Sequence, residues 1–445
     1  MTDTQFFEGH SAFYHTLGCK LNFSETATFA RQFEALGMKT QEKSGGADLC
    51  LINTCSVTEV ANQKCRQAIK RLVRENPDAF VVVTGCYAQL SAKEIAKIEG
   101  VNLVLGSDEK AHLVELVQAA WAGTKTMDAP CFIQPRTRDI QSFAPSCSRG
   151  NRTRYFLKVQ DGCNYFCTYC TIPFARGFSR SPSIASLVEQ ARQVAIEGGK
   201  EIVITGVNIG DFGHTTGETF LDLVKALDQV EGIQRYRISS LEPNLLTDEL
   251  VTFCAESRTF MPHFHIPLQS GSDEVLQLMH RHYDTKLFAH KIQLIKRMMP
   301  DAFIGVDVMV GTRGERPEYF QECYDFLSAL DVTQLHVFPY SERPGTAALR
   351  IPYIVSQEEK KRRAHELLML SDQKTQAFYQ RHIGSEAEVL FERAGEGKPI
   401  HGFTRNYIRT ELPASCGQQH SDNQLVKVRL GNFNNDKTAL MAEII

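Results

Sequence analysis

Three cysteines, Cys163, Cys167 and Cys170, lie in one short run with three and then two residues between them. This spacing lets three thiolates reach one four-iron cluster and leaves one iron without a protein ligand. Such an iron can bind the amino and carboxylate groups of S-adenosylmethionine, whose sulfonium carbon–sulfur bond breaks when the cluster donates an electron. The run therefore predicts radical chemistry in an α/β protein.

A structural zinc site or three unrelated core thiols would be the alternatives. Zinc sites that stabilise a fold use four ligands, and no fourth Cys or His follows this run at short range. With 13 cysteines in 445 residues, a run of this spacing would arise by chance in roughly one chain in a hundred. Spacing and the missing fourth ligand together favour the iron–sulfur interpretation.

A second set of cysteines, Cys19, Cys55 and Cys86, is spread over the first 125 residues. Apolar runs alternate there with helical patterns, which predicts a parallel α/β domain. The predicted strands are Ala12 to Thr16, Asp48 to Asn53, Phe80 to Thr84 and Val101 to Leu105. Each of the three cysteines follows a predicted strand, so all three should meet at the carboxyl edge of one sheet and hold a second cluster. A single cysteine at a strand end is more often a small buried hydrophobe, and only the set of three favours ligation.

The other cysteines show no comparable spacing, and we expect them to be packing or surface thiols: Cys50, Cys65, Cys131, Cys147, Cys254, Cys323 and Cys416.

The strand–helix alternation restarts at residue 154. Six units in about 190 residues fall short of the eight of a closed barrel, so we expect a partial (βα)6 barrel with the Cys163 run after its first strand. In the C-terminal part of the chain, short runs of alternating apolar and polar residues predict a small antiparallel barrel, a fold that often binds oligonucleotides. Because acidic and basic residues balance in this segment, a ligand other than an oligonucleotide is nearly as plausible. The expected domains are residues 1–126, a linker 127–151, residues 152–376 and residues 377–445.

Charge and composition give weaker guidance. A net charge of −3 provides no overall signature of nucleic-acid binding. The tract from Arg136 to Arg180 is rich in basic residues and is either a local RNA-binding patch or a solvated linker. Nothing resembles a secretory signal or a membrane span, so the expected location is the cytoplasm.

Four motifs, in this order, carry a resemblance to a family: Thr16-Leu17-Gly18-Cys19-Lys20-Leu21-Asn22, Asn53-Thr54-Cys55-Ser56-Val57-Thr58, Thr84-Gly85-Cys86-Tyr87-Ala88-Gln89 and the Cys163 run. The chain resembles the radical S-adenosylmethionine methylthiotransferases over essentially its whole length. The resemblance implies an N-terminal domain with an auxiliary 4Fe-4S cluster, a partial-barrel radical domain with a second 4Fe-4S cluster, and a C-terminal TRAM barrel. It also implies S-adenosylmethionine as cofactor.

Short motifs in the sequence are similar to those of the family branch that acts on threonylcarbamoyladenosine beside the anticodon of tRNA. For that branch, the resemblance implies that a methylated sulfur replaces the hydrogen on C2 of the adenine. It implies tRNA as a partner, flavodoxin or ferredoxin as electron donor, a sulfur donor that stays unknown, and a monomer without membrane attachment. Other branches act on isopentenyladenosine in tRNA or on an aspartate of a ribosomal protein. A rival from another class is a non-catalytic RNA-binding protein stabilised by zinc.

No side chain is expected to act as a catalytic acid or base, because the chemistry belongs to the clusters. The resemblance and the ends of predicted barrel strands give candidate cofactor contacts: Gly198, Gly199, Thr205, Asn208, Ser240, Glu242 and Gln269. Helix capping is the alternative for several of these polar residues. The candidate substrate contacts are Arg176, Arg281, Asp307, Tyr340 and Arg343. We expect His263 and His265, which lie on either side of a Phe in a predicted strand, to be core or wall residues rather than ligands.

Overall fold

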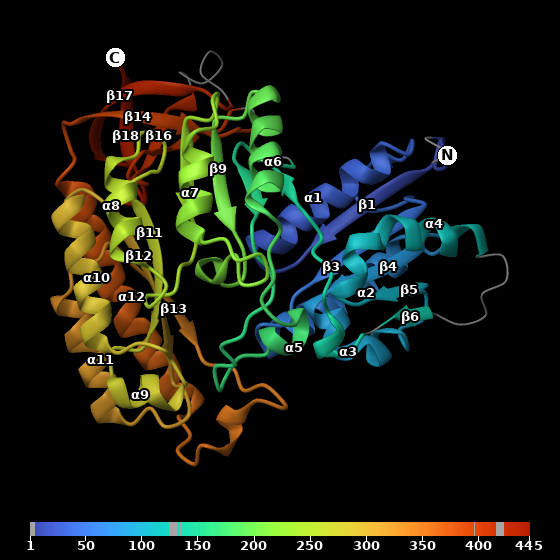
Figure 1. The fold of residues 1–445 in the computed structure, drawn as a ribbon, viewed down its shortest axis with the longest axis horizontal. Helices are drawn as coiled ribbons and strands as arrows, with labels where there is room; N and C mark the ends of the chain where they lie inside the picture. The colour runs from blue at the N-terminus through green and yellow to red at the C-terminus, as the bar shows by residue number, and fades with distance from the viewer. Residues whose placement is uncertain (1–4, 124–130, 134, 151, 396, 415–421) are drawn as a thin grey trace.

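The computed structural model describes residues 5–123, 131–133, 135–150, 152–395, 397–414 and 422–445. Figure 1 shows an N-terminal unit on the right, a central unit on the left and a small C-terminal barrel at the top. Among the described helices, none is both long enough and apolar enough to traverse a bilayer.

The N-terminal unit is a parallel sheet whose described strands follow the order β2-β1-β3-β4-β5-β6. Its central strands, β3 (Leu49–Thr54) and β4 (Phe80–Gly85), are buried along their whole length, as expected where helices cover both faces of a sheet. The outer strands are β1 (Ser11–Thr16), β2 (Lys39–Thr40), β5 (Leu103–Leu105) and β6 (Cys131–Ile133). The helices are α1 (Lys20–Glu34), α2 (Glu59–Glu75), α3 (Cys86–Ile95) and α4 (Leu113–Gly123). The predicted parallel α/β domain is confirmed, and β6 extends it into the segment predicted as a linker.

The central unit is a partial barrel. Its parallel strands are β8 (Tyr155–Lys158), β9 (Glu201–Thr205), β10 (Arg235–Ile238), β11 (His263–Gln269), β12 (Phe303–Val310) and β13 (Gln334–Pro339). Isolated bridges join β10 to the segment that contains β11, so the two sheets continue into one curved wall. A short strand, β7 (Cys147–Ser148), pairs antiparallel with β8. The helices are α5 (Ile172–Arg176), α6 (Ile184–Ile196), α7 (Phe220–Asp228), α8 (Asp248–Glu256), α9 (Asp273–Leu278), α10 (Thr285–Met298), α11 (Pro317–Ala329) and α12 (Gln357–Gln380).

Side chains on the barrel strands alternate between two faces. On the outer face, residues such as Ile204, Val306 and Leu335 join the large apolar core beneath the helices. The inner face carries polar residues at the intervening positions: Lys158, Glu201, Thr205, Arg235, Arg237, His263, His265, Gln269, Asp307 and His336. Polar groups without partners are costly to bury. An interior lined by these residues is therefore a candidate binding site rather than a second hydrophobic core.

The C-terminal unit is a closed barrel with the strand order β14-β15-β16-β18-β17. Its strands are β14 (Glu386–Phe391), β15 (Ile400–Thr404), β16 (Arg409–Leu412), β17 (Leu425–Phe433) and β18 (Leu440–Ile444). It covers the amino ends of the central strands, where Arg237 donates to the carbonyl oxygens of Thr404 (2.7 Å) and Arg405 (2.9 Å). The predicted small barrel is confirmed.

Helix α1 belongs to the N-terminal unit but packs against β7 and β8 of the central unit, as Figure 1 shows in blue beside green. The Ser24 hydroxyl on α1 donates to the carbonyl oxygen of Phe156 at 2.8 Å. The inner face of the partial barrel is therefore flanked by α1 at its side and by the C-terminal barrel at its amino end. We use the name central recess for this polar inner face of the barrel between α1 and the C-terminal unit.

Candidate active site

The cysteines Cys163, Cys167 and Cys170 lie in the loop between β8 and α5, at the carboxyl edge of the barrel. Each sulfur accepts a hydrogen bond. The donors are the backbone N–H of Tyr165 to Cys163 (3.5 Å), that of Ile172 to Cys170 (3.4 Å), and the Arg281 guanidinium to Cys167 (3.2 Å). Such donors stabilise negative charge on sulfur and are the usual surroundings of cluster thiolates.

The electrostatics of these thiols show that they lie together. The pKa of Cys163 is raised to about 11 and that of Cys170 to about 12, mainly by burial, and the neighbouring Cys167 thiol contributes to both shifts. A bound metal cation would displace the thiol protons, because cysteine ligates as the thiolate. The donor set therefore fits a cluster that takes three protein ligands.

The second set also comes together. Cys19 is the N-cap of α1, Cys55 follows β3 and Cys86 is the first residue of α3. Burial raises the pKa of Cys55 to about 12, and the nearby Cys86 and Cys19 thiols contribute to the shift. Two of the three sulfurs lie at helix N-termini, where the helix dipole stabilises a thiolate.

A close approach at Gly18 supports this grouping. Gly18 has φ +100°, and a Cβ there would lie 2.6 Å from Cys55 Cβ and 2.7 Å from Cys55 Sγ. Only glycine leaves room for the Cys55 side chain at this point. The second set therefore also fits a group held by three thiolates.

The nearby thiol of Cys65 is already engaged. Its sulfur donates to the Cys55 carbonyl oxygen at 3.3 Å and accepts from the Cys55 backbone N–H at 3.4 Å. Cys65 is fully buried, which agrees with the prediction that it is a packing thiol. The described thiols of Cys50, Cys147, Cys254 and Cys323 are buried as well.

A buried ionic network connects the two cysteine sets. Arg176 lies 3.1 Å from Glu25 and 3.0 Å from Asp161, and its charge also acts on Cys19 and Cys86. Lys158 pairs with both carboxylates, Lys110 pairs with Glu25, and Arg180 pairs with Asp161. Burial alone would raise the pKa of the Glu25 and Asp161 carboxyls, but these cations hold both well below their usual range.

This network corrects one interpretation of the basic tract from Arg136 to Arg180. Its members Lys158, Arg176 and Arg180 are buried in ion pairs, and Arg154 pairs with Glu392 of the C-terminal unit. They hold domains together rather than form an open RNA-binding patch. Arg136, Arg138 and Arg152 remain exposed.

The polar residues predicted after barrel strands lie at the same edge as the Cys163 run: Thr205, Asn208, Ser240, Glu242 and Gln269. Asn208 is buried, and neither its amide nitrogen nor its amide oxygen makes a hydrogen bond within the described structure. Glu242 pairs with Arg281, the residue that also contacts Cys167. An orphaned buried amide beside the cysteine loop is a natural contact for a polar cofactor.

The structure corrects the prediction that Gly198 and Gly199 contact the cofactor. They precede β9, so they lie at the amino end of the barrel, opposite the Cys163 run. The Gly198 carbonyl oxygen accepts from Asn423 of the C-terminal unit at 2.8 Å. The turn that reaches the correct edge is Gly206 to Asn208, where the backbone N–H groups of Val207 and Asn208 donate to Gln160.

The predicted substrate contacts divide into two groups. Arg176 is buried in the network above, and Arg343 is buried between Ser56 (2.8 Å) and Glu59 (3.0 Å), where it joins the N-terminal and central units. Tyr340 is buried with Lys360 over its ring. Arg281 and Asp307 remain at the site, Arg281 beside Cys167 and Asp307 on the inner face of β12.

Two side chains on the inner face of β13, His336 and Phe338, were not singled out from the sequence. His336 on β13 lies with His265 and Asp307 in one group, in which His265 Nε2 is 2.7 Å from Asp307 Oδ1. Phe338, also on the inner face of β13, is 51% exposed. Only the alternation of a strand already placed in the barrel could have identified these residues.

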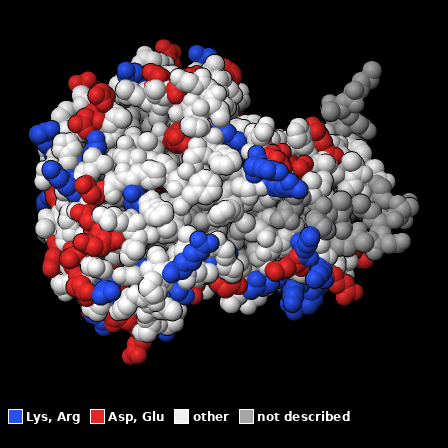
Figure 2. Space-filling view, turned by 60° about the horizontal axis from the view of Figure 1, so that its bottom comes forward, with Lys and Arg blue, Asp and Glu red and all other residues white. Residues whose placement is uncertain are grey.

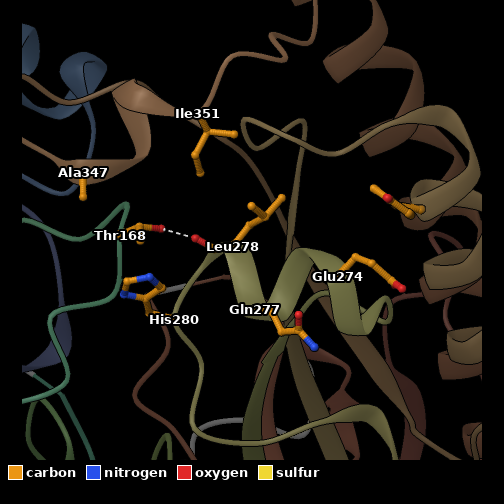
Figure 3. A pocket seen from close by; sticks show the side chains of 8 residues that line it. Thr168, Glu274, Gln277, Leu278, His280, Ala347 and Ile351 are labelled. Carbon is orange, nitrogen blue, oxygen red and sulfur yellow. Dashed lines mark hydrogen bonds between the residues drawn. The ribbon is translucent and has the colours of Figure 1, made fainter.

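A separate pocket lies on the outer side of the cysteine loop (Figure 3). Its volume is about 500 Å³, and its lining includes Thr168, Leu278 and Ile351. The Thr168 hydroxyl donates to the Leu278 carbonyl oxygen at 2.8 Å. No cysteine lines this pocket, so it is distinct from the candidate site.

Figure 2 shows acidic and basic groups interspersed over the face that it presents, with many of the acidic groups at its left.

Two protein-family models match parts of this chain. Residues 11–106 match the Uncharacterized protein family UPF0004, and residues 157–327 match the Radical SAM superfamily. A solved structure of the radical S-adenosylmethionine methyltransferase TsrM from Kitasatospora setae has a TM-score of 0.57 at 15% identity, covering 74% of this chain and 73% of that one. That likeness supports the fold.

Curated relatives extend over nearly the whole chain. The threonylcarbamoyladenosine tRNA methylthiotransferase MtaB of Bacillus subtilis is 36% identical over 94% of this chain and 93% of its own length. A protein of the same description from Aquifex aeolicus is 36% identical over 85% of this chain and 92% of its own length. The tRNA-2-methylthio-N(6)-dimethylallyladenosine synthase of a Sulfurihydrogenibium species is 31% identical over 94% of this chain and 96% of its own length.

Proposed function

The chain belongs to the family of radical S-adenosylmethionine methylthiotransferases, and from this premise we propose that it converts N6-threonylcarbamoyladenosine in tRNA to the 2-methylthio derivative. The relatives named for this substrate are more similar in sequence than the relative named for dimethylallyladenosine. One structural observation carries the proposal, namely two sets of three cysteines connected by a buried ionic network. The Radical SAM match favours this enzyme over a zinc-stabilised RNA-binding protein.

In this proposal, Cys163, Cys167 and Cys170 hold the radical 4Fe-4S cluster, and Cys19, Cys55 and Cys86 hold an auxiliary 4Fe-4S cluster. When bound, the clusters and S-adenosylmethionine supply one-electron chemistry, sulfur and a methyl group, which no side chain can provide at an aromatic C–H. In the same proposal, S-adenosylmethionine binds at the carboxyl edge of the barrel through Thr205, Asn208, Ser240, Glu242 and Gln269.

The protein's own residues orient and enclose the reactants. Arg281 donates to Cys167 and is itself oriented by Glu242. Arg176 connects α5 to α1, so that the loop with Cys163 and the helix that begins after Cys19 keep a fixed relation. The central recess and its exposed Phe338 offer an aromatic face for a nucleobase, as in recognition of unpaired RNA bases. The domain boundaries and the monomeric state stay part of the proposal.

A substrate assay tests this function. Protein reconstituted under anaerobic conditions would be incubated with S-adenosylmethionine, a reductant such as reduced flavodoxin, and tRNA carrying threonylcarbamoyladenosine or isopentenyladenosine. Mass analysis of the nucleosides should show the 2-methylthio derivative of threonylcarbamoyladenosine. Conversion of isopentenyladenosine instead would replace this substrate with that of the neighbouring branch, and conversion of neither would contradict tRNA as the substrate.

A further inference from the structure

Three side chains on the inner face of the barrel form a group that has no role in the proposed function. His265 lies on β11, Asp307 on β12 and His336 on β13, three neighbouring parallel strands. Each side chain offers one ligand atom, and these atoms all lie within 4.8 Å of one another. The group is either a metal site or an ordinary hydrogen-bonded pair with a histidine beside it.

The register of the strands brings the three side chains together. Asp307 is the register partner of His336, and Gly305, two residues earlier on the same strand, is the register partner of His265. Residues 305 and 307 share one face of the sheet because side chains alternate along a strand. The group therefore occupies two adjacent levels of one face, and the strands themselves hold it in place.

The missing side chain of Gly305 leaves room for one of the imidazole rings. A Cβ at Gly305 would lie only 3.2 Å from Nε2 of His336. This nitrogen thus lies over Gly305, the register partner of His265, and the centroids of the two imidazole rings are 4.9 Å apart. A larger residue at position 305 would crowd the ring of His336, so glycine here allows two imidazoles to lie close together.

Hydrogen bonding accounts for only part of the group. His265 Nε2 lies 2.7 Å from Asp307 Oδ1, so these two side chains satisfy each other. Among the described residues, neither ring nitrogen of His336 has a hydrogen-bond partner. The side chains of His265 and Asp307 are 22% and 17% exposed, so water and a small ion can reach them. A hydrogen-bonded pair alone would leave the position of His336 unexplained.

Two imidazoles and one carboxylate form a well-known set of metal ligands. This set binds divalent first-row metal ions and leaves other coordination positions open, whereas structural zinc sites are closed by four protein ligands. Histidine binds metals as neutral imidazole and aspartate binds them as carboxylate. A metal ion would therefore replace the proton that His265 and Asp307 share, and His336 would supply the third ligand.

We propose that His265, Asp307 and His336 bind one divalent first-row metal ion, separate from the two proposed clusters. Water or another oxygen ligand fills the open coordination positions. The site uses no cysteine, and the inference does not depend on which nucleoside the enzyme modifies. It gives His265 a ligand role that the sequence did not suggest.

Titration of the holoenzyme with Mn²⁺ tests the site. Protein reconstituted under anaerobic conditions would be treated with a chelator, desalted and titrated, and electron paramagnetic resonance would measure the free ion. Mn²⁺ is the probe because it prefers hard oxygen-rich sites to thiolates, so cysteines compete poorly for it. Wild-type protein should bind about one Mn²⁺ per chain at this site. Pulsed spectra of the bound ion should show coupling to imidazole nitrogen.

Matched variants locate the bound ion. His336→Gln and Asp307→Asn should each weaken Mn²⁺ binding at least about 10-fold, because the loss of even a group that orients a metal ligand costs about that much affinity. His290→Gln is the control, since His290 forms an exposed pair with Asp248 (3.5 Å) and should bind Mn²⁺ as wild-type protein does. Unchanged absorbance of the iron–sulfur clusters would show that each variant is folded.

Absence of bound Mn²⁺ in wild-type protein would overturn the inference. Binding that persists in both His336→Gln and Asp307→Asn would also overturn it, because the ion would then lie elsewhere. Should a variant lose its clusters, the spectrum of wild-type protein still decides, because a bound ion without nitrogen coupling would contradict ligation by the two histidines.

Discussion

At the scale of single residues, the site depends on small side chains that admit sulfur. Gly18 leaves the space that Cys55 occupies, and Gly85 at φ +101° lies so close to the Thr54 backbone that a Cβ would be 2.4 Å from its carbonyl oxygen. Both glycines precede proposed ligands of the auxiliary cluster. Their contribution is steric, so it can be separated from ligation itself.

Gly18→Ala should therefore impair the auxiliary cluster while all six proposed ligands remain. The new methyl group would overlap Cys55, and anaerobically reconstituted protein should bind about four iron atoms per chain instead of about eight. Gly198→Ala is the matched control, because Gly198 has φ +79° but no atom within 4 Å of the added Cβ. Iron analysis would contradict the account if Gly18→Ala bound as much iron as wild-type protein.

Short spacing predicted the Cys163 run as cluster ligands, whereas Cys19, Cys55 and Cys86 were grouped because each follows a predicted strand of one parallel sheet. The family resemblance misplaced Gly198 and Gly199, because a glycine pair before a strand resembles one after it until the position of the strand in the barrel is known. The sequence could not distinguish Arg176 from a surface arginine, because Glu25, the partner of Arg176, lies 151 residues away along the chain.

At the scale of elements, apolar runs predicted the strands well because parallel strands are buried on at least one face. Boundaries were harder to predict. Helix α3 begins at Cys86, directly after β4, and has non-helical angles at Ser91, so two short helices meet there at a kink. Strand β15 has a weak apolar pattern, because two of its three buried positions are Gly402 and Thr404.

The ionic contacts between α1 and α5 lead to a stability prediction. Arg176→Met would leave Glu25 and Asp161 with fewer cations in a buried site, and removal of one partner from such a network costs about 3–5 kcal/mol. The free energy of unfolding, measured with urea, should fall by that amount. Arg192→Met removes an exposed arginine that pairs with Glu189 on α6 and should change it by less than about 1 kcal/mol. Equal effects of the two substitutions would contradict the role assigned to the network.

At the scale of the whole molecule, three units flank one recess, and polar contacts join them alongside apolar packing such as that of Phe303 against the C-terminal barrel. Arg343 joins the N-terminal unit to the loop after β13, Arg237 joins the central unit to the C-terminal barrel, and Glu25 joins α1 to β8. No sequence pattern shows such pairings, because each joins residues far apart in the chain. The domain order was nevertheless predictable from changes in hydrophobic period.

These polar contacts predict a pH dependence. The pKa values of Glu25 and Asp161 are lower in the folded protein than in the unfolded chain, so their stabilisation is complete above the unfolded values, near pH 4. It is lost as pH falls further toward the folded values. The difference in free energy of unfolding between wild-type protein and Arg176→Met should therefore shrink between about pH 5 and pH 2. A difference that stays constant over this range would show that the pairs contribute little.

The central claim is that two sets of three cysteines hold two clusters with separate tasks. The most direct measurement compares Cys163→Ala with Cys19→Ala for cleavage of S-adenosylmethionine to 5'-deoxyadenosine and for methylthiolation of tRNA. The account predicts that Cys163→Ala loses both activities, whereas Cys19→Ala still forms 5'-deoxyadenosine but makes no methylthiolated nucleoside. Loss of both activities to the same extent in both variants, or product formation by Cys19→Ala, would contradict it.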